Sequence, residues 1–269
     1  MESAALDGVW RGMDYIDVEE ARRRSGLRLV LTAGVPGPWG EAAKAIFHVK
    51  GLEYAAVRQV AGERNEALQD WTGQSSAPVA IWNDEPPCST SRRILWLAER
   101  LRPEPRLVPG DAEERVSCLG VCDEIHGENG LGWCRRLAMF APMLDGLGND
   151  SRDDRLGFMA WKYGYSREAA AAAEARTVEI LDALAARLER QRARGSRYLI
   201  GDSLSAADLY WAAFAAMLAP MPPERCPMSD GMRAMYTVGD GAVSAALRPE
   251  LLAHRDHVYE THLPLPMSF

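Results

Sequence analysis

Three residues with reactive side chains recur at intervals of four: Cys118, Cys122 and His126. On an α-helix this spacing puts side chains on one face, and thiolate and imidazole are the ligands that zinc prefers. A straight helix rises 1.5 Å per residue, so the donors would be spread over about 12 Å, too far to close around one ion. We therefore expect no metal here. The row is either a buried stripe of reduced core residues or the carrier of a functional histidine.

The secondary structure that must position these residues changes along the chain, from alternating strands and helices to helices alone. In the first hundred residues, short apolar strands alternate with helices, which predicts an α/β domain with at least one parallel strand pairing. The predicted strands are 29–31, 53–60 and 78–82, and the predicted helices are 41–50, 63–71 and one capped by 89–91. Residues 1–26 are polar, contain a short helix that ends near Gly26, and are expected to be an extension.

A linker and a long helical region follow. Residues 102–110 contain three prolines, so neither a helix nor an inner strand can run through them. The helices predicted beyond it are at about 111–145, 152–164, 166–194, 205–219 and 243–260. We therefore divide the chain into an extension (1–26), an α/β domain (27–102), a linker (103–110) and an all-helical domain (111–269).

One segment is specific enough to suggest a family. From Tyr198 to Asp208 the chain reads YLIGDSLSAAD, in which Ser205 and Asp208 form a capping box before an apolar helix. With the strand-helix-strand domain, this segment resembles the cytosolic glutathione transferases over about residues 27–260. The resemblance implies a thioredoxin-like α/β N-terminal domain, an all-α C-terminal domain, glutathione as co-substrate, and a homodimer that pairs first domain with second.

The resemblance assigns roles to residues of the first domain. Ala77-Pro78 matches the family's cis-proline, whose preceding residue offers its main chain to the cysteinyl part of glutathione. Ser91 matches a serine that holds the γ-glutamyl carboxylate at a helix start, and we expect it to cap that helix, to bind glutathione, or both. Trp39 lies next to the expected glutathione loop. Thr90 departs from the family, which usually has Glu or Gln there.

A larger departure lies where the family activates the glutathione thiol. Its members have Ser, Cys or Tyr in the first loop, because a hydrogen-bond donor stabilises the thiolate, but Gly37 takes that place here. Thr32 and Tyr15 could replace the hydroxyl only through geometry that the sequence does not reveal. The N-terminus of the helix that starts near Trp39 remains as an electrostatic stabiliser of a thiolate.

In the fold that this resemblance implies, the helix after the linker lines the pocket for the electrophilic substrate. His126, Asn129 and Trp133 would lie near that pocket. Glycines within 127–132 would weaken or kink the helix and open room for a ligand. We therefore expect these three residues to contact the substrate, and a core histidine is the alternative for His126.

Composition disfavours several classes of function. The formal net charge of −7 argues against nucleic acid and anionic membranes as partners. Five cysteines in 269 residues are too few for a disulfide framework and suit a reducing compartment. No apolar run reaches the ~20 residues that cross a bilayer, and the acidic N-terminus is unlike a signal peptide, so we expect a cytoplasmic protein.

The sequence as a whole predicts an enzyme of the glutathione transferase type. Its glutathione thiolate would attack a small hydrophobic electrophile, with transfer, isomerisation or reductive cleavage as the outcome. The alternative is a transferase-fold protein that binds a ligand or a partner without catalysis, as Gly37 would allow.

Overall fold

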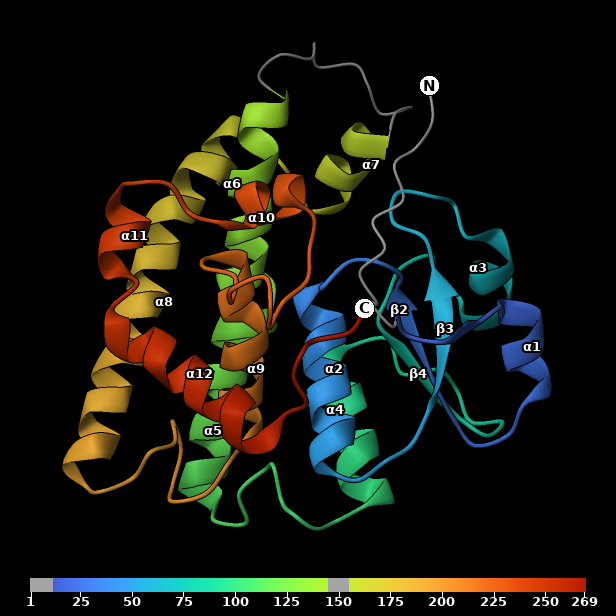
Figure 1. Ribbon diagram of the computed structural model, residues 1–269, viewed down its shortest axis with the longest axis horizontal. Helices are drawn as coiled ribbons and strands as arrows, with labels where there is room; N and C mark the ends of the chain where they lie inside the picture. Colours follow the sequence, from blue (N-terminus) through green and yellow to red (C-terminus); the bar gives the residue numbers. More distant parts are fainter. Residues whose placement is uncertain (1–11, 145–154) are drawn as a thin grey trace.

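The structure, a computed structural model, describes residues 12–144 and 155–269. A four-stranded sheet flanked by helices lies on one side of the molecule, and a helical domain lies on the other (Figure 1). This is the expected fold class, a thioredoxin-like α/β domain followed by an all-α domain.

The sheet is built around two buried central strands. Its strands are β1 (Tyr15–Ile16), β2 (Leu27–Thr32), β3 (Ala55–Gln59) and β4 (Val79–Trp82), in the order β1-β3-β2-β4. β2 pairs in parallel with β3, with Val30 opposite Val57, and antiparallel with β4, with Leu29 opposite Ala80. Helices cover both faces, which explains why β2 is an almost continuous apolar run. β1 is an unpredicted strand that covers the free edge of β3.

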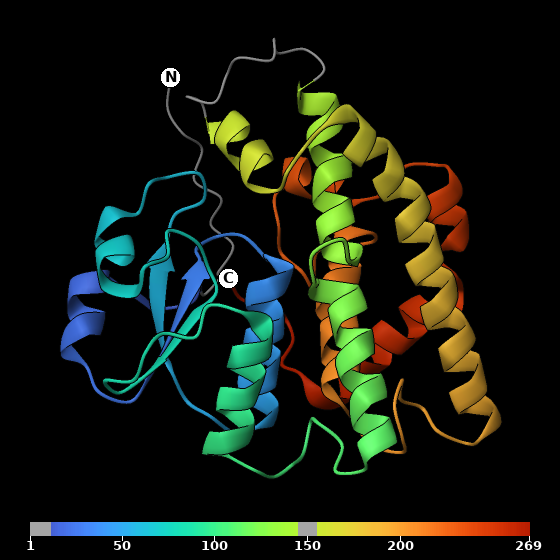
Figure 2. The same cartoon turned by 180° about the vertical axis from the view of Figure 1, so that it is seen from behind.

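Four helices cover the sheet. They are α1 (Val18–Arg23), α2 (Pro38–Val49), α3 (Glu66–Thr72) and α4 (Ser91–Leu101). α1 and α3 lie on the outer face, whereas α2 and α4 lie between the sheet and the helical domain (Figures 1 and 2). α2 therefore has neighbours in both domains.

The helical domain differs in detail from the predicted pattern. Its helices are α5 (Ala112–His126), α6 (Leu131–Leu144), α7 (Arg155–Lys162), α8 (Arg167–Ala193), α9 (Ala206–Phe214), α10 (Asp230–Tyr236), α11 (Ala242–Ala246) and α12 (Pro249–His262), with a 3₁₀ turn at Ala215–Met217. The sequence did not predict α10, and the helix expected at 243–260 is divided before Pro249, which begins α12. Residues 145 and 152–154 of the expected helices lie outside the described residues.

The helix expected at 111–145 is two helices, α5 and α6, separated by a turn of glycines. A Cβ on Gly127 would lie 2.6 Å from the Asp123 carbonyl oxygen, and one on Gly130 would lie 2.8 Å from the Glu124 carbonyl oxygen. Only residues without a side chain allow the chain to fold back so closely on α5. The glycines that were predicted to weaken or kink one helix instead end α5 and separate it from α6.

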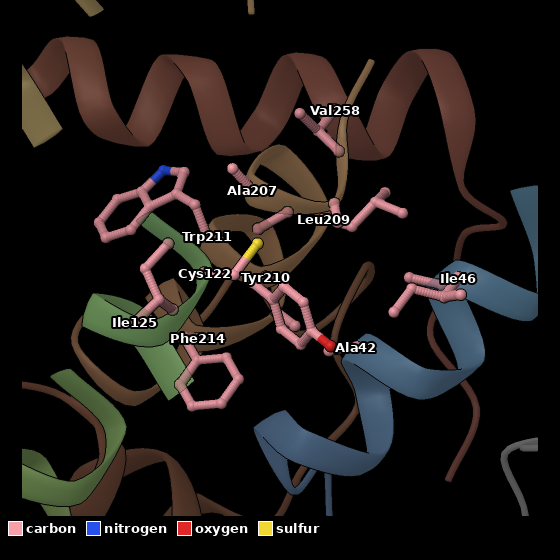
Figure 3. Close-up of a cluster of buried hydrophobic side chains, with 14 of the residues drawn as sticks. Ala42, Ile46, Cys122, Ile125, Ala207, Leu209, Tyr210, Trp211, Phe214 and Val258 are labelled. Carbon is pink, nitrogen blue, oxygen red and sulfur yellow. The ribbon is translucent and has the colours of Figure 1, made fainter. Parts of the chain in front are cut away.

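The core of the helical domain surrounds α9, which is buried along its whole length. Figure 3 shows its side chains between α5, α12 and α2, with Tyr210 directed toward Ala42 of α2. The Trp211 indole N–H donates to the carbonyl of Leu251, the third residue of α12, at 2.9 Å. One continuous core thus joins the helical domain to the first domain.

The predicted capping box is present at the start of α9. The Asp208 carboxylate accepts hydrogen bonds from the Ser205 N–H (2.9 Å), the Ser205 hydroxyl (2.7 Å) and the Leu199 N–H (2.7 Å). Nε2 of His254, on α12, lies 2.9 Å from the same carboxylate. All four residues are buried, so this network joins α9 to α12 and to the preceding turn.

The segment after α12 returns to the first domain and lies along α2 (Figure 1). Met267 is buried there, and the Lys44 ammonium donates to the Ser268 carbonyl, 224 positions away in sequence. Among the described residues, no helix has the length and apolar character needed to span a membrane.

Candidate functional site

A cleft of about 270 Å³ lies between the two domains. Its first wall comes from the ends of β2 and β3, the loop and first turn of α2, and Ser76 and Ala77, which precede Pro78 and β4. Its second wall comes from α6, α7 and α10 and from Tyr163, the residue that follows α7. Three of the predicted glutathione-site residues line this cleft: Gly37, Trp39 and Ala77.

Gly37 lies immediately before α2, whose first residue is Pro38. The Gly37 φ of −63° is ordinary for any residue, and a Cβ built there would meet nothing within 4 Å. No side chain caps α2, so the first N–H groups of the helix have no side-chain partner and can stabilise an anion. The loop therefore offers helix-end electrostatics and room for a side chain, but no hydroxyl of its own.

The predicted cis bond between Ala77 and Pro78 is confirmed. Pro78 directly precedes β4, and Ala77 lines the cleft on the same side as Gly37. The main chain before the proline is thus part of the cleft wall.

Trp39 connects the two domains. Its indole N–H donates to the His126 carbonyl at the end of α5, at 3.0 Å, and its ring meets Phe214 edge-on at a centroid distance of 4.9 Å. Gly132 makes this contact possible, because a Cβ there would lie 2.3 Å from the Phe214 ring and 3.1 Å from the Trp39 ring. The cleft wall at Trp39 is therefore tightly packed.

Thr90, and not Ser91, caps α4. The Thr90 side chain accepts from the Arg93 N–H at 3.3 Å, whereas Ser91 is the first helical residue. The Ser91 carbonyl accepts from the Tyr210 hydroxyl at 3.1 Å, a second contact between the domains. The expected cap at Ser91 is thus corrected, because the residue before the helix has the right geometry. Neither residue is among those that line the cleft.

His126, Asn129 and Trp133 are also not among the lining residues. The His126 ring packs against Tyr210 at 4.5 Å between centroids, and desolvation lowers the pKa of His126 to about 4, so it is neutral at pH 7. Asn129 is exposed in the turn between α5 and α6, with φ of +60°. The Trp133 indole N–H donates to the Tyr163 carbonyl at 3.1 Å, so Trp133 supports a residue of the wall.

The row of sulfur and nitrogen side chains on α5 lies inside the protein. Cys118 and Cys122 are buried, and burial raises the pKa of the Cys122 thiol well above its ordinary value. Within residues 12–144 and 155–269, no three His, Cys, Asp or Glu side chains are grouped so that they could hold a metal ion.

Both alternative hydroxyl groups, those of Thr32 and Tyr15, belong to residues that line the cleft. The Thr32 hydroxyl donates to the side-chain oxygen of Gln59 at 2.7 Å. The Tyr15 hydroxyl is buried and has no partner among the described residues, and desolvation together with the Glu41 carboxylate raises its pKa to about 12. Tyr15 therefore remains a neutral hydroxyl at physiological pH.

Sequence reasoning missed the residues of the second wall. Arg136, Lys162, Tyr163 and Tyr236 line it, together with Met159, Met232 and Met235. Arg136 follows Trp133 by three residues and so lies on a neighbouring part of the same helix face. The three-residue spacing from Trp133 could therefore have identified Arg136. Tyr236 lies on a helix of seven residues that the hydrophobic periodicity did not predict.

Residues 167–257, from α8 to α12, match the family model described as the glutathione S-transferase C-terminal domain. No curated protein matches the sequence.

The fold is similar to that of solved glutathione S-transferases. One from Methylobacterium radiotolerans, in complex with glutathione sulfonate, is 17% identical, with a TM-score of 0.60 over 91% of this chain and 98% of that one. A rice enzyme in complex with glutathione is 20% identical, with a TM-score of 0.58 over 91% and 93%. A bacterial zeta-class maleyl pyruvate isomerase is 18% identical, with a TM-score of 0.55 over 87% and 92%. The chain thus has the fold of the cytosolic glutathione S-transferases, and its residues 167–257 match the C-terminal domain of that family.

Proposed function

We propose that this protein binds glutathione in the cleft between its domains and uses the glutathione thiolate to attack a small hydrophobic electrophile. The observation that carries the proposal is the meeting of Gly37, Ala77 and an aromatic second wall around one cleft of about 270 Å³. The glutathione and glutathione sulfonate complexes of proteins with the same fold support this choice of ligand.

In this proposal, each element of the first domain has a separate task. The Ala77 main chain, next to Pro78, holds the cysteinyl part of glutathione, and the N-terminus of α4 at Ser91 holds the γ-glutamyl carboxylate. The uncapped start of α2 lies beside the sulfur and stabilises the thiolate. The sulfur then forms a bond to the electrophilic carbon while the leaving group departs with its electron pair. Trp39 and Tyr163 enclose the acceptor.

Binding is tested by retention on immobilised glutathione and elution by free glutathione. Ser91→Ala should weaken retention about tenfold to a hundredfold, because a hydrogen bond to a charged group contributes about 1.5–3 kcal/mol. Ser89→Ala, in the turn before the helix, is the matched control and should leave retention unchanged. Equal retention of both variants would show that Ser91 does not bind glutathione. If the unmodified protein is not retained, glutathione is not the ligand.

A second candidate function is ligand or partner binding without catalysis. The absence of a side chain at Gly37 favours it, as does the commitment of the Thr32 hydroxyl to Gln59. Substitution at Gly37 distinguishes the two functions, because the space beside it is open. If the protein is catalytic, Gly37→Ser should raise the turnover of 1-chloro-2,4-dinitrobenzene by about tenfold or more, because the new hydroxyl donates a hydrogen bond to the glutathione thiolate.

The matched control is Gly37→Ala, which fills the same space without a hydroxyl. Turnover that stays at background in both variants, while glutathione is still retained, would favour the non-catalytic function. Equal gains in both variants would attribute the effect to backbone rigidity instead of a hydrogen bond.

The proposal extends to assembly and location. Trp96 on α4 and Val116 on α5 are large apolar side chains with 43% and 73% of their surface exposed, one on each domain. Their exposure fits a homodimer in which the first domain (27–102) of one subunit contacts the second domain (111–269) of the other. We propose the cytoplasm as the location of this dimer. Trp96→Glu should convert the dimer to a monomer in light scattering. A dimer that persists in Trp96→Glu and in Val116→Glu would contradict this pairing.

A further inference from the structure

The second wall of the cleft carries positive charge without a matching acid. Arg136 from α6 and Lys162 from α7 line it, and among the described lining residues the one carboxylate is that of Glu41. Glu41 already has a partner, because the Lys44 ammonium lies 2.8 Å from it. In a protein whose formal net charge is −7, a cleft with two cations and a neutralised acid is a local reversal of sign.

The Arg136 guanidinium is held in place by Tyr236, and no ion pair joins it to an acid within residues 12–144 and 155–269. It donates to the Tyr236 hydroxyl at 3.5 Å and lies over the Tyr236 ring at 5.9 Å from the centroid. Its Nε is buried and has no hydrogen-bond partner among the described residues. A buried donor of a charged group without a partner is costly, and a planar guanidinium matches a carboxylate with two parallel hydrogen bonds. Arg136 is therefore positioned for an anionic group that enters the cleft.

The surroundings of Arg136 fit the rest of such a ligand. Tyr163 and Trp39 supply ring surfaces, and three methionines supply adaptable apolar contacts: Met159, Met232 and Met235. Lys162 lies on the exposed rim of the same wall. The wall thus combines apolar and aromatic side chains with one cation held by Tyr236 and one cation at the exposed rim.

We propose that the cleft selects an electrophile that carries a carboxylate on an aromatic body, and that Arg136 is the residue that determines this specificity. The inference rests on the proposed function, since it names the acceptor class of the same reaction. Lys162 at the rim attracts the anion, and Arg136 binds its carboxylate while the ring lies against Tyr163.

Two acceptors, one with and one without the negative charge, test the inference: 4-chloro-3-nitrobenzoate and its methyl ester. Because the ester ring is also intrinsically more reactive, each acceptor is compared between the variant and the unmodified protein. In both reactions the glutathione sulfur bonds to the ring carbon, chloride leaves, and the thiol proton passes to solvent. Arg136→Gln should lower kcat/KM for the carboxylate about tenfold to a hundredfold, and that for the ester less than about twofold. Lys162→Gln should cause a smaller, salt-sensitive loss for the carboxylate.

Arg176→Gln is the matched control, because Arg176 lies outside the cleft on α8, where Glu124 and Glu179 are its partners. It should leave both acceptors unchanged. Equal losses for carboxylate and ester in Arg136→Gln would overturn the inference, since they would indicate damage to the cleft as a whole. Loss of retention of Arg136→Gln on immobilised glutathione would also overturn it, because Arg136 would then hold glutathione.

Calorimetric binding of the two acceptors in the absence of glutathione separates this inference from the proposed function. If the unmodified protein neither binds glutathione nor turns over either acceptor, the proposed function fails. The inference would still be supported if 4-chloro-3-nitrobenzoate binds more tightly than its ester and Arg136→Gln abolishes the difference. Equal binding of the two compounds by the unmodified protein would overturn it.

Discussion

Two groups of polar side chains in this protein have opposite hydrogen-bonding states. At the start of α9, the Asp208 carboxylate has four partners, which belong to Leu199, Ser205 and His254. In the cleft, the Tyr15 hydroxyl and the Arg136 Nε have none among the described residues. Both groups are buried, so the difference does not come from access to water.

The comparison indicates which polar groups stabilise the fold and which remain available to a ligand. A fully paired buried network specifies one arrangement of the chain, whereas an unpaired buried donor reduces stability until something binds to it. Substitutions in the paired group should therefore cost more stability than substitutions in the unpaired group.

Removing Asp208 should have the largest effect on stability. Asp208→Ala leaves two buried N–H groups and the His254 ring without a partner, and should cost about 3–5 kcal/mol or prevent folding. The control is Asp202→Ala, an exposed acid in the same turn, which should cost less than about 0.5 kcal/mol. Urea unfolding measures both, and a loss below about 1 kcal/mol for Asp208→Ala would contradict the role of the network.

His126 should make stability depend on pH. Its pKa is about 4 in the folded protein and ~6.5 in the unfolded chain, so the unfolded state binds the proton more tightly. The resulting stability is present above pH 6.5 and is lost as the pH falls toward 4, by about 3 kcal/mol.

His126→Gln should remove that part of the acid dependence in urea unfolding at pH 7 and pH 4. His48→Gln, at an exposed position on α2, is the control. Equal acid sensitivity of His126→Gln and the unmodified protein would mean that the ring is accessible to water and not packed against Tyr210.

Gly132 tests the packing behind the cleft wall. Gly132→Ala places a methyl group 2.3 Å from the Phe214 ring and should cost about 1–3 kcal/mol. Gly120→Ala, within α5 and with nothing near its Cβ, should instead stabilise the protein by about 0.5–1 kcal/mol through helix propensity. Thermal unfolding that moves in the same direction for both variants would contradict the close approach of α6, α9 and Trp39.

Two tyrosines give the smallest and most direct test of the comparison. Tyr210→Phe removes a hydroxyl that donates to Ser91 and should cost about 0.5–1.5 kcal/mol. Tyr15→Phe removes a buried hydroxyl without a partner and should be neutral or stabilising by up to about 1 kcal/mol. If Tyr15→Phe destabilises the protein as much as Tyr210→Phe does, the Tyr15 hydroxyl has a partner after all.

The fold could be predicted where local signals agree with the tertiary structure. The β2-α2-β3 pattern and the capping box at Ser205 depend on residues that are adjacent or a few positions apart. The cis bond at Ala77-Pro78 was predicted from the family resemblance and not from the dipeptide itself. β1 could not be predicted, because two residues form it and its pairing partner β3 lies far along the chain.

Only the first wall of the cleft contains lining residues that were predicted from the sequence. Gly37, Trp39 and Ala77 were assigned through the family resemblance of the first domain, and all three line the cleft. The second wall depends on how α6, α7 and α10 pack, and that arrangement requires the break at Gly127–Gly130, which the glycines suggested only as a weakness. The same break turns Asn129 toward solvent and leaves Arg136 in the wall.

The return of the chain to α2 has a consequence for synthesis in the cell. Lys44 and Ser268 are in contact although 224 positions separate them. At roughly 5–20 residues per second, a ribosome needs about 11–45 s to make that interval. Until then, the part of the α2 surface that Ser268 covers in the folded protein stays open to water, even after α9 has been made.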